Sequence, residues 1–212
     1  MPAPSRTSLD RIVAAGAAVL EAEGPDSLTM QAVARVVGVR APSLYKHVDG
    51  RDALVRLIAE DAVRDLAARL DAAAPEGADP ASAMAAAARA LRAFAHDRPA
   101  AFRLVFSPGA EATRPDPELM RLGSATVLRV AGELATPENR LEAARTITAW
   151  ASGFLAMELA GAFRLGGDVE AAFEWGIAHL AAGLRAGASA GASGGAAEVT
   201  AARPGDEAVS PG

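Results

Sequence analysis

The sequence predicts an all-α fold. Hydrophobic residues make up 51% of the 212 residues, yet only 4% are aromatic, and alanine supplies much of the apolar content. This composition favours closely packed helices over a β-sandwich, which is typically rich in valine, threonine and tyrosine. Apolar residues also recur with helical spacing along most of the chain, between prolines and glycines of the kind that mark helix ends.

Three helices are predicted in the first fifty residues, of which the second and third are short. Apolar residues from Leu9 to Leu20 share one face of the first helix, Thr29 is a good N-cap for the second, and Gly38 ends it. Pro42 stands where a proline is tolerated in the first turn of the third helix. We therefore expect helices over about 8–23, 30–37 and 41–47.

Six further helices are expected after these. Leu54, Ile58, Leu66 and Leu70 form a continuous stripe, and the segment PEGADP from residue 75 ends that helix. Further helical patterns begin near prolines. The expected helices are 50–73, 81–96, 99–106, 116–134, 138–163 and 168–185. After them the chain lacks periodicity and large apolar residues, which predicts a disordered tail over 187–212.

The charge is unevenly distributed along the chain. The net charge of the whole chain is −5, which by itself argues against a nucleic-acid partner. Residues 1–56, however, hold seven Lys and Arg against six Asp and Glu, a net +1, so the other 156 residues carry −6. The N-terminal quarter is therefore the part of the chain in which to look for contacts with an anionic partner.

Several classes of site are excluded by composition. The chain has no cysteine, which rules out disulfides, cysteine-ligated metals and a cysteine nucleophile, and fits a reducing cytoplasm best. Its histidines, His47, His96 and His179, are too far apart to predict a metal site. No segment has the roughly 18 uncharged residues that span a bilayer. We expect no cofactor, no metal, no signal peptide and no membrane partner.

Tyr45, Lys46 and His47 stand in a row a few residues after the turn at Gly38. A glycine turn between a second helix and a short third one is the outline of a helix-turn-helix, in which the third helix enters the major groove. At the end of that helix a phenolic hydroxyl, an ammonium and an imidazole can all contact phosphate. Leu44 and Val48 are expected to face the core instead.

The segment LTMQAVARVVGVRAPSLYKHVDGRDAL, residues 28–54, resembles the DNA-binding half of the TetR family of bacterial transcriptional regulators. The resemblance implies that residues just after the turn face bases and that those around Tyr45 grip phosphates. Arg40 stands where the family usually has Ser or Thr, which makes it a candidate reader of guanine. The DNA-binding residues so expected are Thr29, Arg40, Ala41, Pro42, Ser43, Tyr45, Lys46, His47 and Arg51.

The C-terminal half is similar to a regulator subgroup named for a Trp-His-Gly signature. The similarity lies in residues 98–106 and 146–184; Trp150 and Gly153 are kept, and Ser152 stands where the histidine would be. It implies a cavity for a largely apolar effector, with Arg103 and Glu158 as polar anchors. The expected lining is Phe102, Arg103, Phe106, Trp150, Phe154, Met157 and Glu158. Bulky residues on these helices would equally well form the core.

A stripe on the last helix suggests a dimer interface. Its residues recur at helical spacing, and two glycines on the preceding helix allow close approach. The residues are Gly153, Gly161, Phe173, Ile177, Leu180 and Leu184. An internal hairpin of the two helices would give the same pattern.

Together these features predict a ligand-responsive repressor that binds a palindromic operator as a homodimer. We expect a flexible arm over 1–7, a helix-turn-helix domain over 8–50 and a ligand-binding and dimerisation domain over 51–186, with the helix over 50–73 as the lever between them. The alternatives are a small helical enzyme or ligand carrier, which would need clustered catalytic groups that we do not find, and a helical protein that does not read sequence. We expect no catalytic residues.

Overall fold

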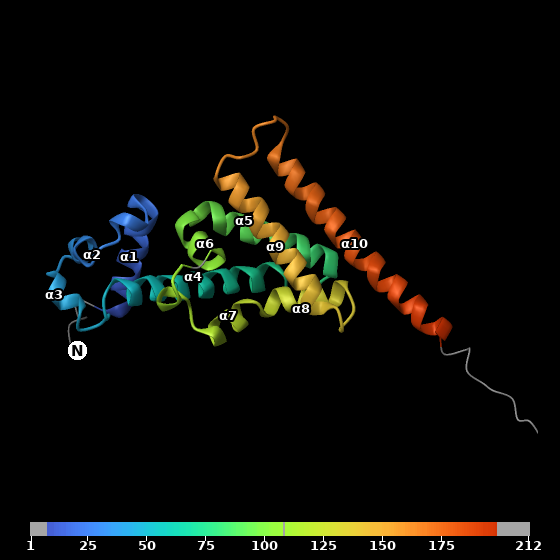
Figure 1. The fold of residues 1–212 in the computed structure, drawn as a ribbon, viewed down its shortest axis with the longest axis horizontal. Coiled ribbons are helices and arrows are strands. Elements are labelled where there is room, and N and C mark those ends of the chain that lie inside the picture. Colours follow the sequence, from blue (N-terminus) through green and yellow to red (C-terminus); the bar gives the residue numbers. More distant parts are fainter. Residues whose placement is uncertain (1–7, 108, 199–212) are drawn as a thin grey trace, which may run out of the picture.

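The computed structural model describes residues 8–107 and 109–198, and all regular structure in that part of the chain is helical. Figure 1 shows a small N-terminal unit at one end of the long helix α4 and a larger helical domain around the rest of it. The predicted all-α fold is confirmed. The helices are α1 (Leu9–Glu23), η1 (Pro25–Ser27), α2 (Met30–Val37), α3 (Ala41–Leu44), α4 (Arg51–Ala73), α5 (Pro80–Asp97), α6 (Pro99–Phe106), η2 (Glu111–Thr113), α7 (Pro117–Gly123), α8 (Ala125–Leu134), α9 (Arg140–Leu159) and α10 (Val169–Glu198).

The N-terminal unit has its own core and well-capped helices. The hydroxyl of Ser8 accepts a hydrogen bond from the Arg11 amide at 3.3 Å, and that of Thr29 accepts one from the Ala32 amide at 3.1 Å. Gly38 ends α2 with φ 81° and ψ 33°, a left-handed conformation that glycine adopts at little cost. The fully buried side chains of this core are Ile12, Leu28, Val33, Leu44, Leu54 and Ile58.

Helix α4 belongs to both cores. Leu54 and Ile58 are part of the N-terminal core, whereas Leu66 and Leu70 are part of the C-terminal one. The boundary between the two cores therefore falls within α4 rather than between residues 50 and 51, where the prediction placed it, because the first two turns of α4 fill the space beside α1.

Helix α6 also touches both cores. Ala100 and Leu104 pack against the N-terminal core, and Phe102 is buried in the C-terminal one. Glu21, near the end of α1, accepts hydrogen bonds from the backbone N–H groups of Ala100 and Ala101, both at 2.9 Å. A carboxylate at this position satisfies N–H groups that a helix N-terminus leaves unpaired and complements the helix dipole. The first turn of α6 is thus tied to α1.

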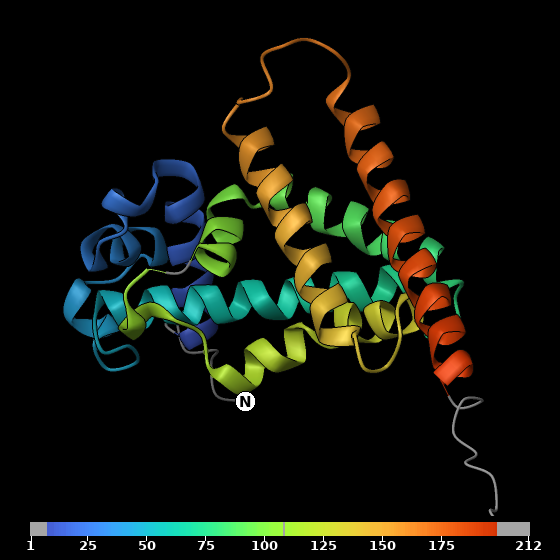
Figure 2. The ribbon, with the colours of Figure 1, turned by 45° about the vertical axis from the view of Figure 1, so that its right-hand side comes forward.

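The C-terminal domain is built from α4 to α10. Figure 2 shows α9 and α10 side by side, joined by a loop at their upper ends. Phe94 of α5, Leu155 of α9 and Phe173 of α10 are each 0% exposed. These three helices therefore meet around one apolar centre.

Some helix boundaries differ from the prediction. The expected helix over 116–134 is two helices, α7 and α8, that meet at Ser124. A Cβ at Gly123 would lie 2.7 Å from Val63 Cγ1, so α7 can approach α4 this closely only with a glycine there. Helix α3 ends at Leu44 and continues to 47 as a turn. Helix α9 ends at Leu159, and the chain turns at Gly161 with φ 62° instead of continuing to 163.

The last helix is longer than predicted. Helix α10 runs to Glu198, so residues 187–198 are helical where we expected disorder. Alanine, which has the highest helix propensity, recurs through this segment and offsets the cost of its glycines. The rest of the predicted tail, 199–212, and the predicted arm, 1–7, lie outside the described residues.

Candidate functional site

The end of α3 forms a polar surface at the tip of the N-terminal unit. Tyr45, at 55% exposure, and Lys46 and His47 face outward, while Leu44 and Val48 are buried. The predicted division into an outer and a core face is therefore confirmed. Within the described part of the chain the three outward side chains make no hydrogen bond or ion pair, so they are available to bind a partner.

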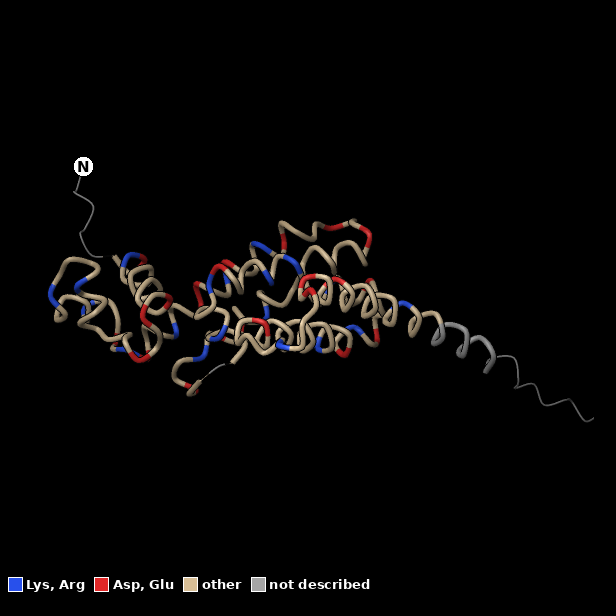
Figure 3. The backbone as a smooth tube through the Cα atoms, turned by 90° about the horizontal axis from the view of Figure 1, so that it is seen from above, with Lys and Arg blue, Asp and Glu red and all other residues tan. Residues whose placement is uncertain are grey.

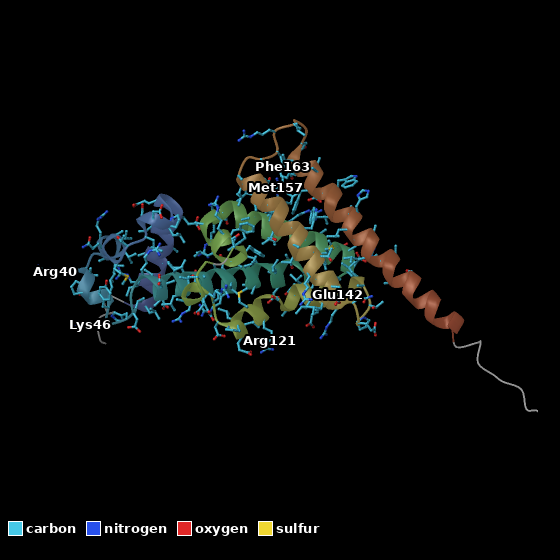
Figure 4. The ribbon with its side chains drawn as sticks, in the orientation of Figure 1. Arg40, Lys46, Arg121, Glu142, Met157 and Phe163 are labelled. Carbon is cyan, nitrogen blue, oxygen red and sulfur yellow. The ribbon has the colours of Figure 1, made fainter. Side chains whose placement is uncertain are left out.

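The residues before and within α3 extend this surface. Arg40 has an extended backbone, with φ −85° and ψ 143°, and its exposed side chain makes no capping hydrogen bond. Pro42 is exposed, and Ala41 and Ser43 are half-buried. Arg40 and Lys46 lie at the same outer end of the molecule (Figure 4), which carries basic positions (Figure 3). The residues predicted to face bases and those predicted to contact phosphates therefore lie close together.

Thr29 and Arg51 have structural partners. The hydroxyl of Thr29 caps α2, although the residue is exposed and its O–H can still donate. Arg51 donates from Nε to the Leu28 carbonyl at 2.9 Å and from a terminal nitrogen to the Pro25 carbonyl at 2.7 Å. Arg51 was predicted to bind DNA; in the structure its guanidinium holds the segment between α1 and α2 through these two bonds.

The C-terminal domain holds a cavity of about 770 Å³ that is partly open to solvent. Its walls come from α4 to α9, and most of the lining is aliphatic. The polar residues among the described lining are Arg121, Ser124, Arg145, Thr148 and Ser152. A volume within roughly 300–1,000 Å³ and an apolar wall with few polar groups are typical of small-molecule sites.

The predicted pocket residues on α6 lie near this cavity. Phe106 lines it, and the ring of buried Phe102 lies 4.9 Å from that of Phe106. Arg103 is exposed and does not line the cavity, because it lies on the side of α6 turned to solvent. Phe106 therefore keeps its predicted place and Arg103 does not.

The predicted pocket residues on α9 lie elsewhere. Thr148 and Ser152 line the cavity; Trp150, two positions from each, lies roughly 200° around the helix from them. Its ring stacks on Phe173 of α10 at 5.3 Å. The structure thus corrects the pocket prediction for a whole face of α9, which turns away from the cavity toward α10, α5 or solvent. The residues concerned are Trp150, Phe154, Met157 and Glu158.

Glu158 is an ion-pair residue rather than a ligand anchor. Its carboxylate accepts a hydrogen bond from Arg92 of α5 at 2.7 Å and lies 3.4 Å from His96. The hydrogen bond from Arg92 holds the pKa of Glu158 below its usual value, against the opposite effect of burial. The pair joins α5 to α9.

The predicted dimer stripe lies inside the chain. Phe173 and Ile177 are 0% and 3% exposed, and Leu180 and Leu184 pack against the same core. The internal hairpin that the pattern also allowed is therefore what the structure shows, since α10 needs this face to cover α5 and α9.

The two predicted interface glycines are exposed. No atom lies within 4 Å of a Cβ added at Gly153 or Gly161, so neither serves close packing within the chain. In the described residues no three His, Cys, Asp or Glu side chains gather as metal ligands would. No described helix is long and apolar enough to cross a membrane.

Two sequence profiles match the chain. Residues 12–58 match one described as bacterial regulatory proteins, tetR family, and residues 84–180 match one described as tetracyclin repressor-like, C-terminal domain. The chain belongs to the TetR family. It is accordingly a DNA-binding transcriptional regulator. The C-terminal match does not support the predicted Trp-His-Gly subgroup.

Individual relatives agree with a TetR-family regulator. The uncharacterized HTH-type transcriptional regulator Rv0681 of Mycobacterium tuberculosis is 28% identical over 183 residues, which cover 85% of this chain and 83% of that protein. The solved structure of SCO4313 is 28% identical with a TM-score of 0.69, over 81% of this chain and 94% of that one. A TetR variant from Acinetobacter baumannii AYE in complex with minocycline shares the fold, with 24% identity and a TM-score of 0.64 over 84% of this chain and 96% of that one.

Proposed function

We propose that this TetR-family regulator is a cytoplasmic repressor that binds a palindromic operator as a homodimer and releases it when a small molecule fills the C-terminal cavity. One observation supports the link between ligand and DNA. The cavity is lined by residues of α4 and α6, the two helices that also pack against the N-terminal core. A ligand that changes the packing around the cavity acts on both of them.

The outer surface of α3 supports sequence-specific binding. In this proposal Arg40 and Ser43 contact base edges, since a free guanidinium can donate two hydrogen bonds to guanine. Tyr45, Lys46 and His47 contact phosphates, which position the helix without reading sequence.

The route from cavity to DNA in this proposal runs through α6 as well as α4. Val105 and Phe106, at the end of α6, line the cavity, whereas Glu21 holds its first turn to α1. The ligand must bind better to a conformation in which the recognition helices of the dimer no longer match the operator, because equal affinity for both states would shift nothing. The minocycline complex of a structural relative supports a small-molecule ligand here.

We place the dimer contact on the sides of α9 and α10 that face away from the core. These sides carry Gly153, Met157 at 49% exposure and Trp175 at 64% exposure, with the His179 ring stacked on that of Trp175 at 3.8 Å. Large exposed side chains beside small ones fit a second copy of the same helix pair. Trp175→Glu should give a folded monomer in sedimentation; a dimer of unchanged affinity would place the interface elsewhere.

Footprinting on the DNA that flanks the coding region tests the regulator function. We expect a two-fold symmetric footprint whose preferred sequence changes in Arg40→Ala. Compounds that release the operator should lose this effect in Ser152→Phe, which fills the cavity, and keep it in Ala93→Phe, an exposed position on α5. A footprint without symmetry, or a Ser152→Phe protein that responds as the wild type does, would contradict the proposal.

A further inference from the structure

The charged groups of the cavity are all positive. Arg121 and Arg145 line it, together with the hydroxyl groups of Ser124, Thr148 and Ser152, and no aspartate or glutamate is found among the described lining residues. A ligand with a positive charge would meet two guanidinium groups and no carboxylate among the described lining residues. The lining therefore selects for a ligand that accepts hydrogen bonds and carries negative charge.

The two arginines differ in what already binds them. Arg121 is paired with Glu118, one turn before it on α7. Arg145 makes no ion pair or hydrogen bond within the described residues. It is also exposed, which places it where the cavity meets solvent. An unpaired arginine at a cavity mouth is available to a ligand without first breaking an existing bond.

Arg145 stands at one end of a polar stripe. Thr148 and Ser152 follow it at i+3 and i+7, so the three side chains lie along the same side of α9. Thr148 has no hydrogen-bond partner among the described residues, and Ser152 has only a long bond, 3.4 Å, to the Ala149 carbonyl. Both hydroxyls can therefore donate to an oxygen held by Arg145 or to a polar atom further along the same molecule.

The rest of the wall is aliphatic. Leu66, Leu70, Met84, Leu91 and Val130 are all buried and come from three helices, α4, α5 and α8. Phe106 is the single aromatic side chain among the described lining residues. Few rings are thus available to stack on a flat aromatic ligand, whereas a flexible hydrocarbon body can follow this surface.

From this combination we propose that the ligand is an aliphatic carboxylate, with its carboxylate on Arg145 and its hydrocarbon body along α4, α5 and α8. The assignment rests on the proposed function, because it names the class of effector for the same cavity. Arg145 binds the head group and the aliphatic wall removes the body from water, so both parts of the ligand are needed for tight binding.

The test uses three series of probe compounds on the full chain. Straight-chain carboxylates from octanoate to hexadecanoate are compared with the primary alcohol and the primary amine of the same length, all below their micelle-forming concentrations, by isothermal titration calorimetry. We expect the carboxylate to bind about tenfold more tightly than the alcohol, as befits a charged hydrogen bond at a partly exposed site, and the amine to bind most weakly.

Variants assign that preference to one side chain. Arg145→Met should bind carboxylate and alcohol equally, and Arg145→Lys should keep most of the preference. Arg140→Met is the control, since Arg140 is exposed on the same helix and does not line the cavity. A wild type that binds none of the series, or prefers the alcohol or amine, would overturn the assignment. So would an Arg145→Met protein that keeps the preference.

Operator release separates this assignment from the proposed function. Carboxylates that bind with the expected preference but leave the operator bound would confirm the ligand class and contradict the effector role of the cavity. If carboxylates fail but another compound releases the operator and Ser152→Phe abolishes that release, the effector role stands and the ligand class is wrong.

Discussion

Replacing Glu21 with alanine should loosen the contact between α1 and α6. The carboxylate accepts hydrogen bonds from the Ala100 and Ala101 amides, both at 2.9 Å. Loss of an N-cap costs about 0.5–2 kcal/mol, and loss of a charge that complements the helix dipole costs about 0.3–1 kcal/mol. Because Glu21 is partly exposed, we expect the two losses together to lower the free energy of unfolding by about 2 kcal/mol.

For a chain of this size each kcal/mol lowers the melting temperature by about 2–4 °C, so Glu21→Ala should melt about 4–8 °C below the wild type. The melting temperature of Glu21→Gln should lie between those of the wild type and Glu21→Ala, since an amide oxygen can still accept a hydrogen bond but carries no charge. Calorimetry measures the melting temperature, and hydrogen exchange should increase at the Ala100 and Ala101 amides. Glu23→Ala is the control, because Glu23 is exposed and has no partner among the described residues.

Equal melting temperatures for Glu21→Ala and Glu23→Ala, or unchanged exchange in the first turn of α6, would refute this reasoning. Either result would mean that apolar packing alone holds α6 against the N-terminal unit. Glu21 would then have no role in the link between the cavity and the DNA-binding unit.

Three other predictions follow from the same structure. Lys46→Ala should weaken binding to specific and nonspecific DNA alike. It should also reduce the slope of the logarithm of the binding constant against the logarithm of the salt concentration by about one unit, measured by fluorescence anisotropy; an unchanged slope would remove Lys46 from the interface. Arg51→Met should lower thermal stability but leave that slope unchanged, since its guanidinium is bound to carbonyl groups. Glu158→Gln should lower the free energy of unfolding by about 2 kcal/mol at pH 7, which is less than the roughly 3–5 kcal/mol lost when one partner of a fully buried ion pair is removed. Because Arg92 lowers the pKa of Glu158, this difference should persist above the unfolded-state pKa of about 4.3 and disappear in denaturant titrations as the pH falls through the folded-state pKa.

Much of the helical organisation could be predicted because it depends on local signals. Helix α2 has the predicted bounds, since Thr29 and Gly38 cap it through bonds to neighbouring residues. Helix α6 also has its predicted bounds, because Pro99 starts it. The outward position of Tyr45 could be predicted for a similar reason: the apolar spacing of Leu44 and Val48 determines which side of the segment is buried.

The partners of a side chain could not be predicted in this way. Arg51 bonds to carbonyls more than twenty residues earlier in the chain, and no local pattern marks that contact. Trp150 and Phe154 were expected in the cavity because they are large and apolar, but they pack with Phe173 of α10. Size and polarity indicate that such residues are buried, whereas the rotation of α9 decides which surface they cover.

The sharing of α4 between two cores limits how sensor and DNA-reading parts can be exchanged among regulators of this family. A Cβ at Gly16 would lie 2.9 Å from Ile58 Cδ1 and 3.3 Å from Leu54 Cδ1, so α1 and the first turns of α4 fit as a matched pair. A hybrid joined before Arg51 would bring in foreign side chains at these positions and disturb the DNA-reading unit itself. A hybrid joined after Ala59 keeps the matched pair, and the new sensor then needs to supply only the α4 turns that its own core requires.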